Sequence, residues 1–282
     1  GRFQVDVPVH TRDEVGRLAR SFQSMMATIR DLIERNYEIR IRQKEAELYA
    51  LQQQINPHFM YNTLETINMA VEEGKAGIVV DMVTVLGRML RYSVGKRTPW
   101  VTIAEEVRHV QDYLTIQQIR FKDRLSFEIQ DKIDMDQLWT PKFILQPVVE
   151  NAVKYGLESR KQLSVQIGIS REFGARSGKE DVVFRVRDNG PGIPPERLEQ
   201  LEASLRSDLL PAKDSGFGLV NVNARIAMML GQEYGVQVHS IVDKGTEVTL
   251  RIPVIGPEEA AARMKVKEVG GHGSHSDPDR GR

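Results

Sequence analysis

The sequence predicts an α+β chain, in which a long helical segment is followed by a domain of mixed helices and strands. Two observations support this division. From Val15 to Ile55, apolar residues recur at steps of three and four, which is typical of helices that pack as coiled coils. From Leu125 onward, short stretches alternate between apolar and polar residues and are separated by segments with helical spacing. Such alternation indicates strands.

The composition limits the classes of protein that fit. The chain has 282 residues, enough for about two domains. Lys and Arg balance Asp and Glu at 39 each, which argues against direct nucleic-acid binding, since such domains are basic. There is no cysteine, so disulfides, zinc–thiolate sites and thiol chemistry are excluded. No signal peptide or membrane-spanning run is visible. Because the chain begins at Gly1, we expect a soluble piece of a longer protein.

The first helical segment has the seam of a coiled coil. The seam shifts frame near Ile33, and such a stutter locally unwinds a supercoil. A seam of this length needs a partner helix, so we expect a parallel homodimer. The alternative, a helix packed within one chain, is weaker because the pattern outlasts a typical globular helix. The seam residues are Val15, Leu18, Phe22, Met25, Ile29 and Leu32, then Ile33, Tyr37, Ile41, Lys44, Leu48, Leu51 and Ile55.

The stretch from Gln54 to Asn62 interrupts this helix with Pro57. A proline inside a helix removes a backbone donor and clashes with the preceding turn, so we expect a kink near Gln53. His58 follows the bend directly and should lie outside the regular packing. An imidazole is largely neutral at neutral pH, and its bare nitrogen is a nucleophile. We therefore hypothesise that His58 accepts a phosphoryl group; the alternative is a kink with a buried, hydrogen-bonded histidine.

Two further helices should complete an antiparallel hairpin. The helix resumes after His58 and should end near Gly74, and a second helix runs from about Ile78 to Ser93. Two such hairpins, one from each chain of a dimer, would form a four-helix bundle. The apolar face of the second helix consists of Met82, Val85, Leu86, Met89 and Leu90.

The remaining elements alternate between helices and strands. Thr102 to Glu105 is a capping-box pattern that opens a helix to about Phe121. Thr140 and Pro141 suggest the N-cap and first turn of a helix to about Leu157, with a bend at Pro147. Strands are expected at Leu125–Gln130, Leu163–Ser170, Asp181–Arg187, Val236–Val242 and Thr246–Pro253. Helices are expected at Pro194–Leu205 and Gly218–Leu230, with a loop between them at Arg206–Ser215. After Gly256 we expect one or two helical turns, followed by a disordered tail from Gly270.

Four clusters of polar residues and glycines could form a site. Glu150, Asn151 and Lys154 fall on one broad side of a helix. An amide oxygen suits Mg²⁺ and an ammonium suits a phosphate, although a solvated helix face is the ordinary alternative. The segment Asp188 to Gly192 ends a strand and lets the backbone approach a flat ligand, but it would also make a tight turn. Gly216, Gly218 and the Gly245-Thr246 pair are equally ambiguous when taken singly.

The order and spacing of these clusters resemble a known family. They match the N box, the D or G1 box, the G2 box and the closing Gly-Thr of the GHKL ATPases, whose fold is a Bergerat α/β sandwich. The stretch from Gln54 to Asn62 is similar to the phosphoacceptor module of LytS/YesM-type sensor histidine kinases. Asp13 to Leu18 resembles the start of the second helix of a HAMP linker.

This resemblance implies ATP and Mg²⁺ as ligands and assigns a role to each candidate residue. His58 would be the phosphoacceptor, Glu150 would orient or deprotonate it, and Asn151 would coordinate Mg²⁺. Asp188 would recognise the adenine amino group, and the loop at Arg206–Ser215 would be the ATP lid. The other implied nucleotide-binding residues are Lys154, Tyr155, Gly190, Gly192, Gly216, Gly218 and Thr246.

One position departs from the commoner histidine kinases. Those have an acidic residue directly after the phosphoacceptor, and this chain has Phe59. The general base therefore stays open between Glu150 and Glu65. Asn62, one turn beyond His58, could position a water that dephosphorylates a partner protein.

The domain boundaries follow from the resemblance. We expect the second half of a HAMP domain with its linker at 1–33, dimerisation and phosphotransfer helices at 34–98, an ATP-binding domain at 99–255 and a mostly disordered tail at 256–282. The implied function is ATP-dependent autophosphorylation of His58 and transfer to an aspartate of a response regulator, often a DNA-binding transcription factor. The chain would be the cytoplasmic part of a bacterial inner-membrane homodimer with an upstream transmembrane sensor. An ATP-driven conformational clamp and a non-enzymatic adaptor are the rival interpretations.

Overall fold

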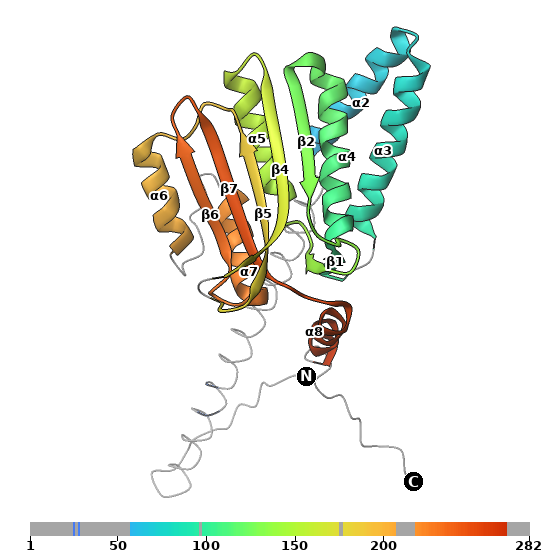
Figure 1. The fold of residues 1–282 in the computed structure, drawn as a ribbon. Helices are drawn as coiled ribbons and strands as arrows, with labels where there is room; N and C mark the ends of the chain where they lie inside the picture. The colour runs from blue at the N-terminus through green and yellow to red at the C-terminus, as the bar shows by residue number, and fades with distance from the viewer. Residues whose placement is uncertain are drawn as a thin grey trace, which may run out of the picture. The chain divides into compact units, whose positions relative to one another are not determined.

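A computed structural model describes residues 25, 28, 57–95, 98–174, 177–206 and 218–269, with side chains to Met264 (Figure 1). The chain divides into two compact units, Gly1–Tyr61 and Asn62–Arg282. The predicted coiled-coil seam, apart from Met25, lies outside the described residues, as do the stutter, the kink near Gln53, the ATP lid after Arg206 and the tail from Gly270. In the first unit, Met25 and Thr28 are helical and residues 57–61 form the start of α2.

Helices α2 (Pro57–Glu72) and α3 (Ala76–Val94) follow one another across a short turn. Gly74 has a φ of 68° in this turn, and the Lys75 nitrogen donates to the Ala70 oxygen at 2.9 Å. Four members of the predicted apolar face of α3 are buried: Met82, Val85, Leu86 and Met89. Helix α3 packs against α4 within the chain.

Helix α4 (Ile103–Phe121) begins where its sequence predicts. The Thr102 hydroxyl accepts a hydrogen bond from the Glu105 nitrogen at 3.1 Å, and the Glu105 carboxylate accepts one from the Thr102 nitrogen at 3.0 Å. This reciprocal pair satisfies two backbone donors at the helix start. Arg88 of α3 then holds α4 from the side, since its guanidinium donates to both carboxylate oxygens of Asp112.

A five-stranded sheet forms the base of the mixed region, in the order β2-β4-β5-β7-β6. Its strands are β2 (Leu125–Asp131), β4 (Leu163–Phe173), β5 (Glu180–Asp188), β6 (Gly235–Ile241) and β7 (Gly245–Pro253). Strands β2 and β4 are parallel, and the other neighbours are antiparallel. The architecture is therefore mixed α and β, as the sequence predicts.

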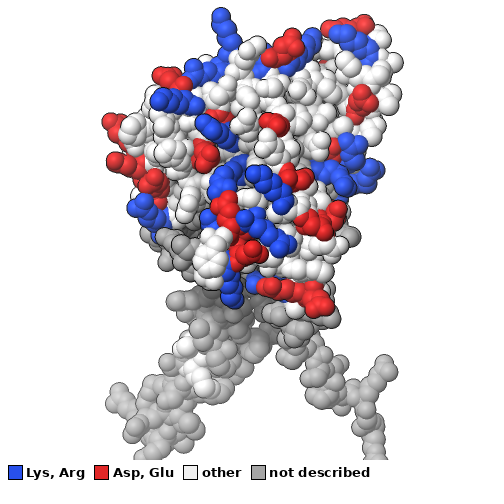
Figure 2. Space-filling view, viewed as in Figure 1, with Lys and Arg blue, Asp and Glu red and all other residues white. Residues whose placement is uncertain are grey.

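The alternating strand pattern places apolar side chains on the face that α4, α5 (Gln146–Ser159) and α7 (Gly218–Leu230) cover (Figure 1). Charged groups occupy the other face, where Arg185 pairs with Glu172. Lys and Arg are interspersed with Asp and Glu over the surface in Figure 2. The buried apolar residues on the helix-covered face include Val165, Ile167, Ile169, Val182, Phe184, Val186, Val248, Leu250 and Ile252.

The start of α5 corrects the sequence-based expectation. Thr140 and Pro141 belong to a short strand, β3 (Trp139–Pro141), which pairs with β1 (Trp100–Thr102). The helix begins five residues beyond Pro141, with Pro147 in its first turn instead of at an internal bend. The buried carboxylate of Glu106 accepts hydrogen bonds from the Phe143 and Leu145 nitrogens, each at 2.9 Å. This contact from α4 fixes the backbone before α5 and overrides the local capping signal.

Helices α6 (Pro195–Arg206) and α8 (Pro257–Val269) complete the described part of the chain. Helix α8 has 13 residues and exceeds the one or two turns expected after Gly256. It is anchored by the fully buried Ala260 and by Arg263, which donates to the Met229 oxygen. No helix among the described residues is long and apolar enough to cross a membrane.

Candidate functional site

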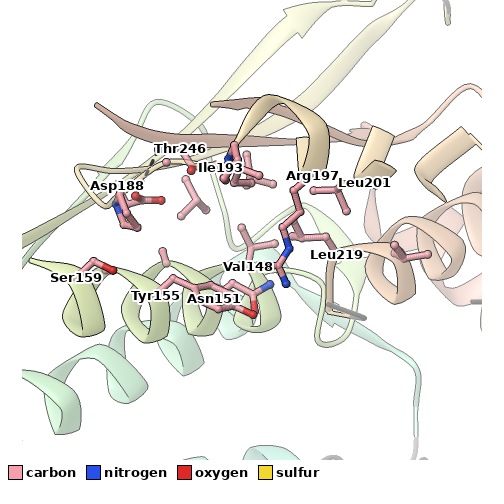
Figure 3. Close-up of a pocket in the computed structure, with 18 of the residues that line it drawn as sticks. Val148, Asn151, Tyr155, Ser159, Asp188, Ile193, Arg197, Leu201, Leu219 and Thr246 are labelled. Atoms are coloured by element: carbon pink, nitrogen blue, oxygen red, sulfur yellow. Dashed lines mark hydrogen bonds between the residues drawn. The ribbon is translucent and has the colours of Figure 1, made fainter. Parts of the chain in front are cut away.

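A pocket of about 340 Å³ opens between α5, α6 and α7 and the ends of β5 and β7 (Figure 3). Apolar side chains such as Val148, Leu201 and Leu219 form much of its wall. The wall also contains five of the candidates predicted from the sequence, which are Asn151, Tyr155, Asp188, Gly192 and Thr246. Residues from distant parts of the chain therefore meet around one concave, largely apolar space, as is usual for small-molecule sites.

Asp188 lies at the end of β5 with its carboxylate at the pocket wall (Figure 3). Its Oδ1 accepts hydrogen bonds from the Gly190 nitrogen at 2.7 Å and from the Thr246 nitrogen at 3.3 Å. Burial raises the pKa of this carboxyl above the ordinary aspartate value, and the two backbone donors partly oppose that shift. Within the described chain, both hydrogen bonds to the Asp188 carboxylate are accepted by Oδ1. The Oδ2 atom is therefore available to accept a hydrogen bond from a ligand.

Gly192 shapes the wall beside Asp188. Its φ of 71° lies in the left-handed region, and a Cβ there would overlap the backbone oxygen of Ile241. Only glycine combines that conformation with such close backbone approach. The Ser240 hydroxyl accepts from the next backbone nitrogen, that of Ile193, at 2.8 Å, which fixes the loop against β6. The Gly-Pro-Gly segment is therefore a rigid wall held by the sheet.

Helix α5 distributes its three polar candidates in different directions. Asn151 faces the pocket, where the first residue of α7, Gly218, approaches it closely enough that a Cβ would lie 3.1 Å from its Nδ2. Lys154 is exposed and outside the pocket wall, with its Nζ 5.3 Å from the centre of the Tyr155 ring. Glu150 is turned toward α4. The predicted convergence of these three residues is thus divided between pocket, solvent and helix interface.

Glu150 is half-buried, and its carboxylate has one hydrogen-bond partner in the described part of the chain, the amide of Gln146. Its Oε1 accepts from the Gln146 Nε2 at 2.7 Å. Burial raises the pKa of this carboxyl, and the hydrogen bond from Gln146 opposes the increase. Burial raises the pKa of Tyr113 on α4, and the Glu150 carboxylate adds to that increase. A carboxyl with a raised pKa is a better proton acceptor at neutral pH than an ordinary glutamate.

The other predicted residues are placed as follows. His58 and Glu65 are exposed on α2, and Asn62 is half-buried on the same helix. His58 belongs to the first compact unit, whereas the pocket belongs to the second. Gly190 contacts Asp188 directly. Gly216 lies outside the described residues.

Three contributors to the site carry no sequence signal that we could interpret. Arg197 of α6 lines the pocket, and its guanidinium points across it toward Asn151 in Figure 3. Gln146 and His109 form a chain of hydrogen bonds behind Glu150. Among the residues that the structure describes, no group of three or more His, Asp or Glu side chains could hold a metal ion. Any metal in the pocket would therefore depend on ligand oxygens together with a group such as the Asn151 amide.

Comparison with protein families finds three successive matches along the chain. Residues 1–31 match the HAMP domain, and residues 46–125 match a family described as histidine kinase. Residues 140–255 match a family described as histidine kinase-, DNA gyrase B-, and HSP90-like ATPase. The third match contains all of the pocket residues named above.

Two relatives found by sequence agree with these family matches. The chain is 39% identical over 250 residues to the sensor histidine kinase YesM of Bacillus subtilis, and the alignment covers 88% of this chain and 40% of that protein. It is 31% identical over 251 residues to the sensor protein LytS of Bacillus anthracis, with 86% and 40% coverage. The chain therefore spans about 40% of the length of these relatives. A solved histidine kinase domain from Erythrobacter litoralis aligns at 14% identity with a TM-score of 0.42, covering 78% of this chain and 95% of that chain.

Proposed function

Since this chain belongs to the LytS/YesM-type sensor histidine kinases, we propose that it phosphorylates His58 with ATP and passes the phosphoryl group to a response-regulator aspartate. The observation that carries this proposal is the meeting of Asp188, Thr246 and Asn151 around one pocket. In this interpretation the pocket belongs to a Bergerat-type α/β sandwich, and the upstream helices present the phosphoacceptor.

The pocket fits an adenine nucleotide. Asp188 Oδ2 is free to accept from the exocyclic amine of adenine, while its Oδ1 is fixed by backbone nitrogens. The rigid loop at Gly192 and the exposed ring of Tyr155 provide flat surfaces for the base or the ribose. Asn151 and Arg197 line the part of the pocket near the start of α7, where a helix N-terminus favours phosphate. Lys154, Gly216 and Gly218 complete the proposed phosphate region.

Asn151 is also the residue that we assign to Mg²⁺. The ion prefers oxygen ligands and in nucleotide enzymes commonly takes most of them from phosphates and water. One amide oxygen is therefore a sufficient protein contribution in a site without a carboxylate cluster. The ion would supply neutralisation of phosphate charge.

In the transfer step, the bare ring nitrogen of His58 forms a bond to the terminal phosphorus of ATP. The bond from that phosphorus to the bridging oxygen breaks, and ADP leaves with the electron pair. The imidazole then holds a surplus proton on its second nitrogen. We propose that Glu150 is the general base that accepts this proton. Glu150 is preferred to Glu65 because it is half-buried, held by Gln146 and has a raised pKa, whereas Glu65 is exposed. In the second step the N–P bond breaks as the regulator aspartate takes the phosphoryl group.

We further propose a homodimer built on a four-helix bundle. Leu64 and Met69 of α2 are exposed by 52% and 55%, and Val80 and Val83 of α3 by 63% and 53%. Large apolar side chains in such numbers on one helical hairpin are typical of an interface. Charged substitutions at Val80 and Val83 should shift the sedimentation coefficient from dimer to monomer, and an unchanged coefficient would exclude these residues from the interface.

The same family membership supports a cellular setting and a second activity. The HAMP match at residues 1–31 fits the cytoplasmic part of a bacterial membrane protein, downstream of a transmembrane sensor. The regulator, often a transcription factor in this family, would bind DNA in place of this chain. Asn62, four positions beyond His58, would position water for dephosphorylation of the regulator. A phosphatase assay in which Asn62→Ala behaves like the wild type would count against that role.

The decisive experiment is incubation of the purified chain with γ-labelled ATP. Acid-labile, alkali-stable label should appear in the wild type, disappear in His58→Gln, and fall steeply in Asn151→Ala. His58→Gln should still bind ADP, since His58 is not part of the pocket. ATP hydrolysis without protein label would instead favour a conformational clamp, and absence of nucleotide binding would favour an adaptor.

A further inference from the structure

Glu150 is the end of a partly buried chain of hydrogen bonds that begins on α4. Gln146 lies one helical turn before Glu150 and donates from Nε2 to its carboxylate at 2.7 Å. The Oε1 of Gln146 lies 2.7 Å from the Nε2 of His109. Because the amide nitrogen faces the carboxylate, the amide oxygen must accept, so His109 carries its proton on Nε2. The direction of the chain is therefore fixed from His109 to Gln146 to Glu150.

The surroundings of His109 hold it in this tautomer. Its side chain is buried, and its ring stacks on Tyr92 with centroids 4.1 Å apart. Burial lowers the pKa of the imidazole, although Glu106 and Asp112 oppose that shift and Lys142 adds to it. The Nδ1 atom is buried and has no hydrogen-bond partner among the residues that the structure describes. A neutral ring with its single proton on Nε2 is the state that this environment favours.

Tyr92 connects the chain to the helical hairpin. It belongs to α3, its hydroxyl donates to the buried Glu106, and the Nζ of Lys142 lies 4.6 Å from its ring centre. These contacts fix the stacking partner of His109 from two sides. The orientation of Gln146 is therefore set by packing between α3 and α4, and not by α5 alone.

We propose that Gln146 and His109 are positioning residues, which hold the Glu150 carboxylate in a single orientation for proton transfer from His58. The claim rests on the proposed kinase function. A general base must point at the proton that it accepts, and an orienting partner behind the base is a recurrent arrangement in proton-transfer sites. The donor from Gln146 also favours the ionised carboxylate, which burial opposes.

The test compares Gln146→Leu and His109→Phe with the wild type. The first removes the donor to Glu150, and the second retains a ring to stack on Tyr92 but has no Nε2 proton. Each substitution should lower the autophosphorylation kcat about tenfold, which is part of the rate acceleration that a general base supplies. The Kd for ADP should stay unchanged. The acid limb of the kcat–pH profile should move to higher pH in Gln146→Leu, because burial then raises the pKa of Glu150 without the opposing hydrogen bond from Gln146.

Three controls separate positioning from general damage. His109→Gln places an amide nitrogen near the position of Nε2 and should recover most of the activity lost in His109→Phe. Gln118→Leu removes an amide on the same helix that donates to the Leu125 oxygen, and should leave kcat unchanged. In a Glu150→Gln background, Gln146→Leu should cause no further loss, because the group that it positions is already absent.

The outcomes are distinguishable from failure of the kinase proposal. A wild-type kcat and pH profile in Gln146→Leu and His109→Phe would overturn the positioning role. If the wild type itself takes no label, the kinase proposal fails, and an NMR titration of the Glu150 carboxyl then tests the positioning contact separately. A higher pKa of Glu150 in Gln146→Leu than in the wild type would support the contact. An unchanged pKa would overturn the inference. If His109→Phe does not fold, the same comparison stands on Gln146→Leu alone.

Discussion

The Oδ1 atom of Asp188 accepts a hydrogen bond from the backbone nitrogen of Thr246 at 3.3 Å, although the two residues lie 58 positions apart. Antiparallel pairing of β5 with β7 places them opposite each other. The contact uses one oxygen of a half-buried carboxylate and leaves the other at the pocket wall. A ligand amine is therefore met by an acceptor whose position is fixed by the sheet.

Asp188→Asn should separate binding from stability. Asparagine can retain the bonds to Gly190 and Thr246 through its oxygen, but it turns an NH₂ group toward the ligand amine, so the Kd for ADP should rise about 10- to 100-fold. A carboxyl whose folded pKa is raised destabilises the native state at pH values above that pKa. The same variant should therefore gain about 1 kcal/mol in free energy of unfolding at pH 7. Calorimetric titration and urea unfolding would measure both, and an unchanged Kd would remove Asp188 from nucleotide recognition.

Nucleotide affinity should also depend on pH through Asp188. The ionised carboxylate accepts from the adenine amine, and burial holds its pKa above the ordinary value. Affinity for ADP should therefore rise with pH, and it should reach its plateau at a higher pH than it would for an aspartate with an ordinary pKa. Titrations across the acidic range would show this limb in the wild type and none in Asp188→Asn. The same limb in both proteins would assign the titration to another group.

Gly192→Ala should deform the pocket wall. The φ of 71° and the overlap of a Cβ with the Ile241 oxygen make alanine strained there, at a cost of about 1–3 kcal/mol. Urea unfolding should show that loss together with weaker ADP binding. Gly168→Ala in β4 is the matched control, because a Cβ there meets open space. Equal stability of the two variants would mean that the loop adjusts without cost.

The local signals in the sequence predicted the local structure well. The capping box of Thr102 and Glu105 uses residues three positions apart, so its effect can be read from the chain directly. Thr140 and Pro141 do not start a helix because a competing interaction comes from Glu106, whose carboxylate accepts from the backbone before α5 across more than thirty positions. A single sequence contains no sign of that contact, nor of the pairing order of the strands.

The same distinction applies to the site. Asn151, Asp188 and Thr246 could be predicted because each belongs to a motif whose order resembles a family. Arg197 has no motif around it, and the bond from His109 to Gln146 joins residues 37 positions apart. The different directions of Glu150 and Lys154 also depend on how α5 packs against α4, which helical spacing alone does not determine.

Glu106→Gln should show how strongly the start of α5 depends on α4. The wild-type carboxylate accepts from the Phe143 and Leu145 nitrogens and from the Tyr92 hydroxyl. A glutamine retains one acceptor and turns an NH₂ group toward a donor, so at least one buried bond is lost. The free energy of unfolding should fall by about 2–3 kcal/mol, as measured with urea.

The neighbouring Glu105→Gln is the control for that change. Glu105 accepts one bond, from the Thr102 nitrogen at the helix start, and a glutamine at this position can still accept it. The loss should be well below 1 kcal/mol. If both variants lost the same small amount, the buried carboxylate would not be what fixes the segment before α5.

The ion pair between Arg185 and Glu172, on the sheet face that the helices leave uncovered, should make the free energy of unfolding depend on pH in the acidic range. Two nitrogens of Arg185 donate to the two carboxylate oxygens of Glu172, and Arg251 lies 3.8 Å away. The hydrogen bonds from Arg185, followed by that from Ser170, lower the pKa of Glu172 to about 2. A carboxyl whose pKa is lower in the folded state than in the unfolded state stabilises the folded protein. This contribution is fully present at pH values above the unfolded-state pKa, near 4.5, and is lost as the pH falls toward the folded-state pKa of about 2.

Glu172→Gln should therefore cost stability at pH 7 and progressively less in acid. Because the pair is partly solvent-exposed, we expect a difference of about 1 kcal/mol at neutral pH. The gap between variant and wild type should stay constant from pH 7 to about pH 5 and then narrow toward pH 2, since Glu172 becomes protonated over this range and loses the charge that glutamine lacks. Thermal unfolding across this range would measure it. A gap that persists undiminished at low pH would show that packing of the side chain, and not its charge, is responsible.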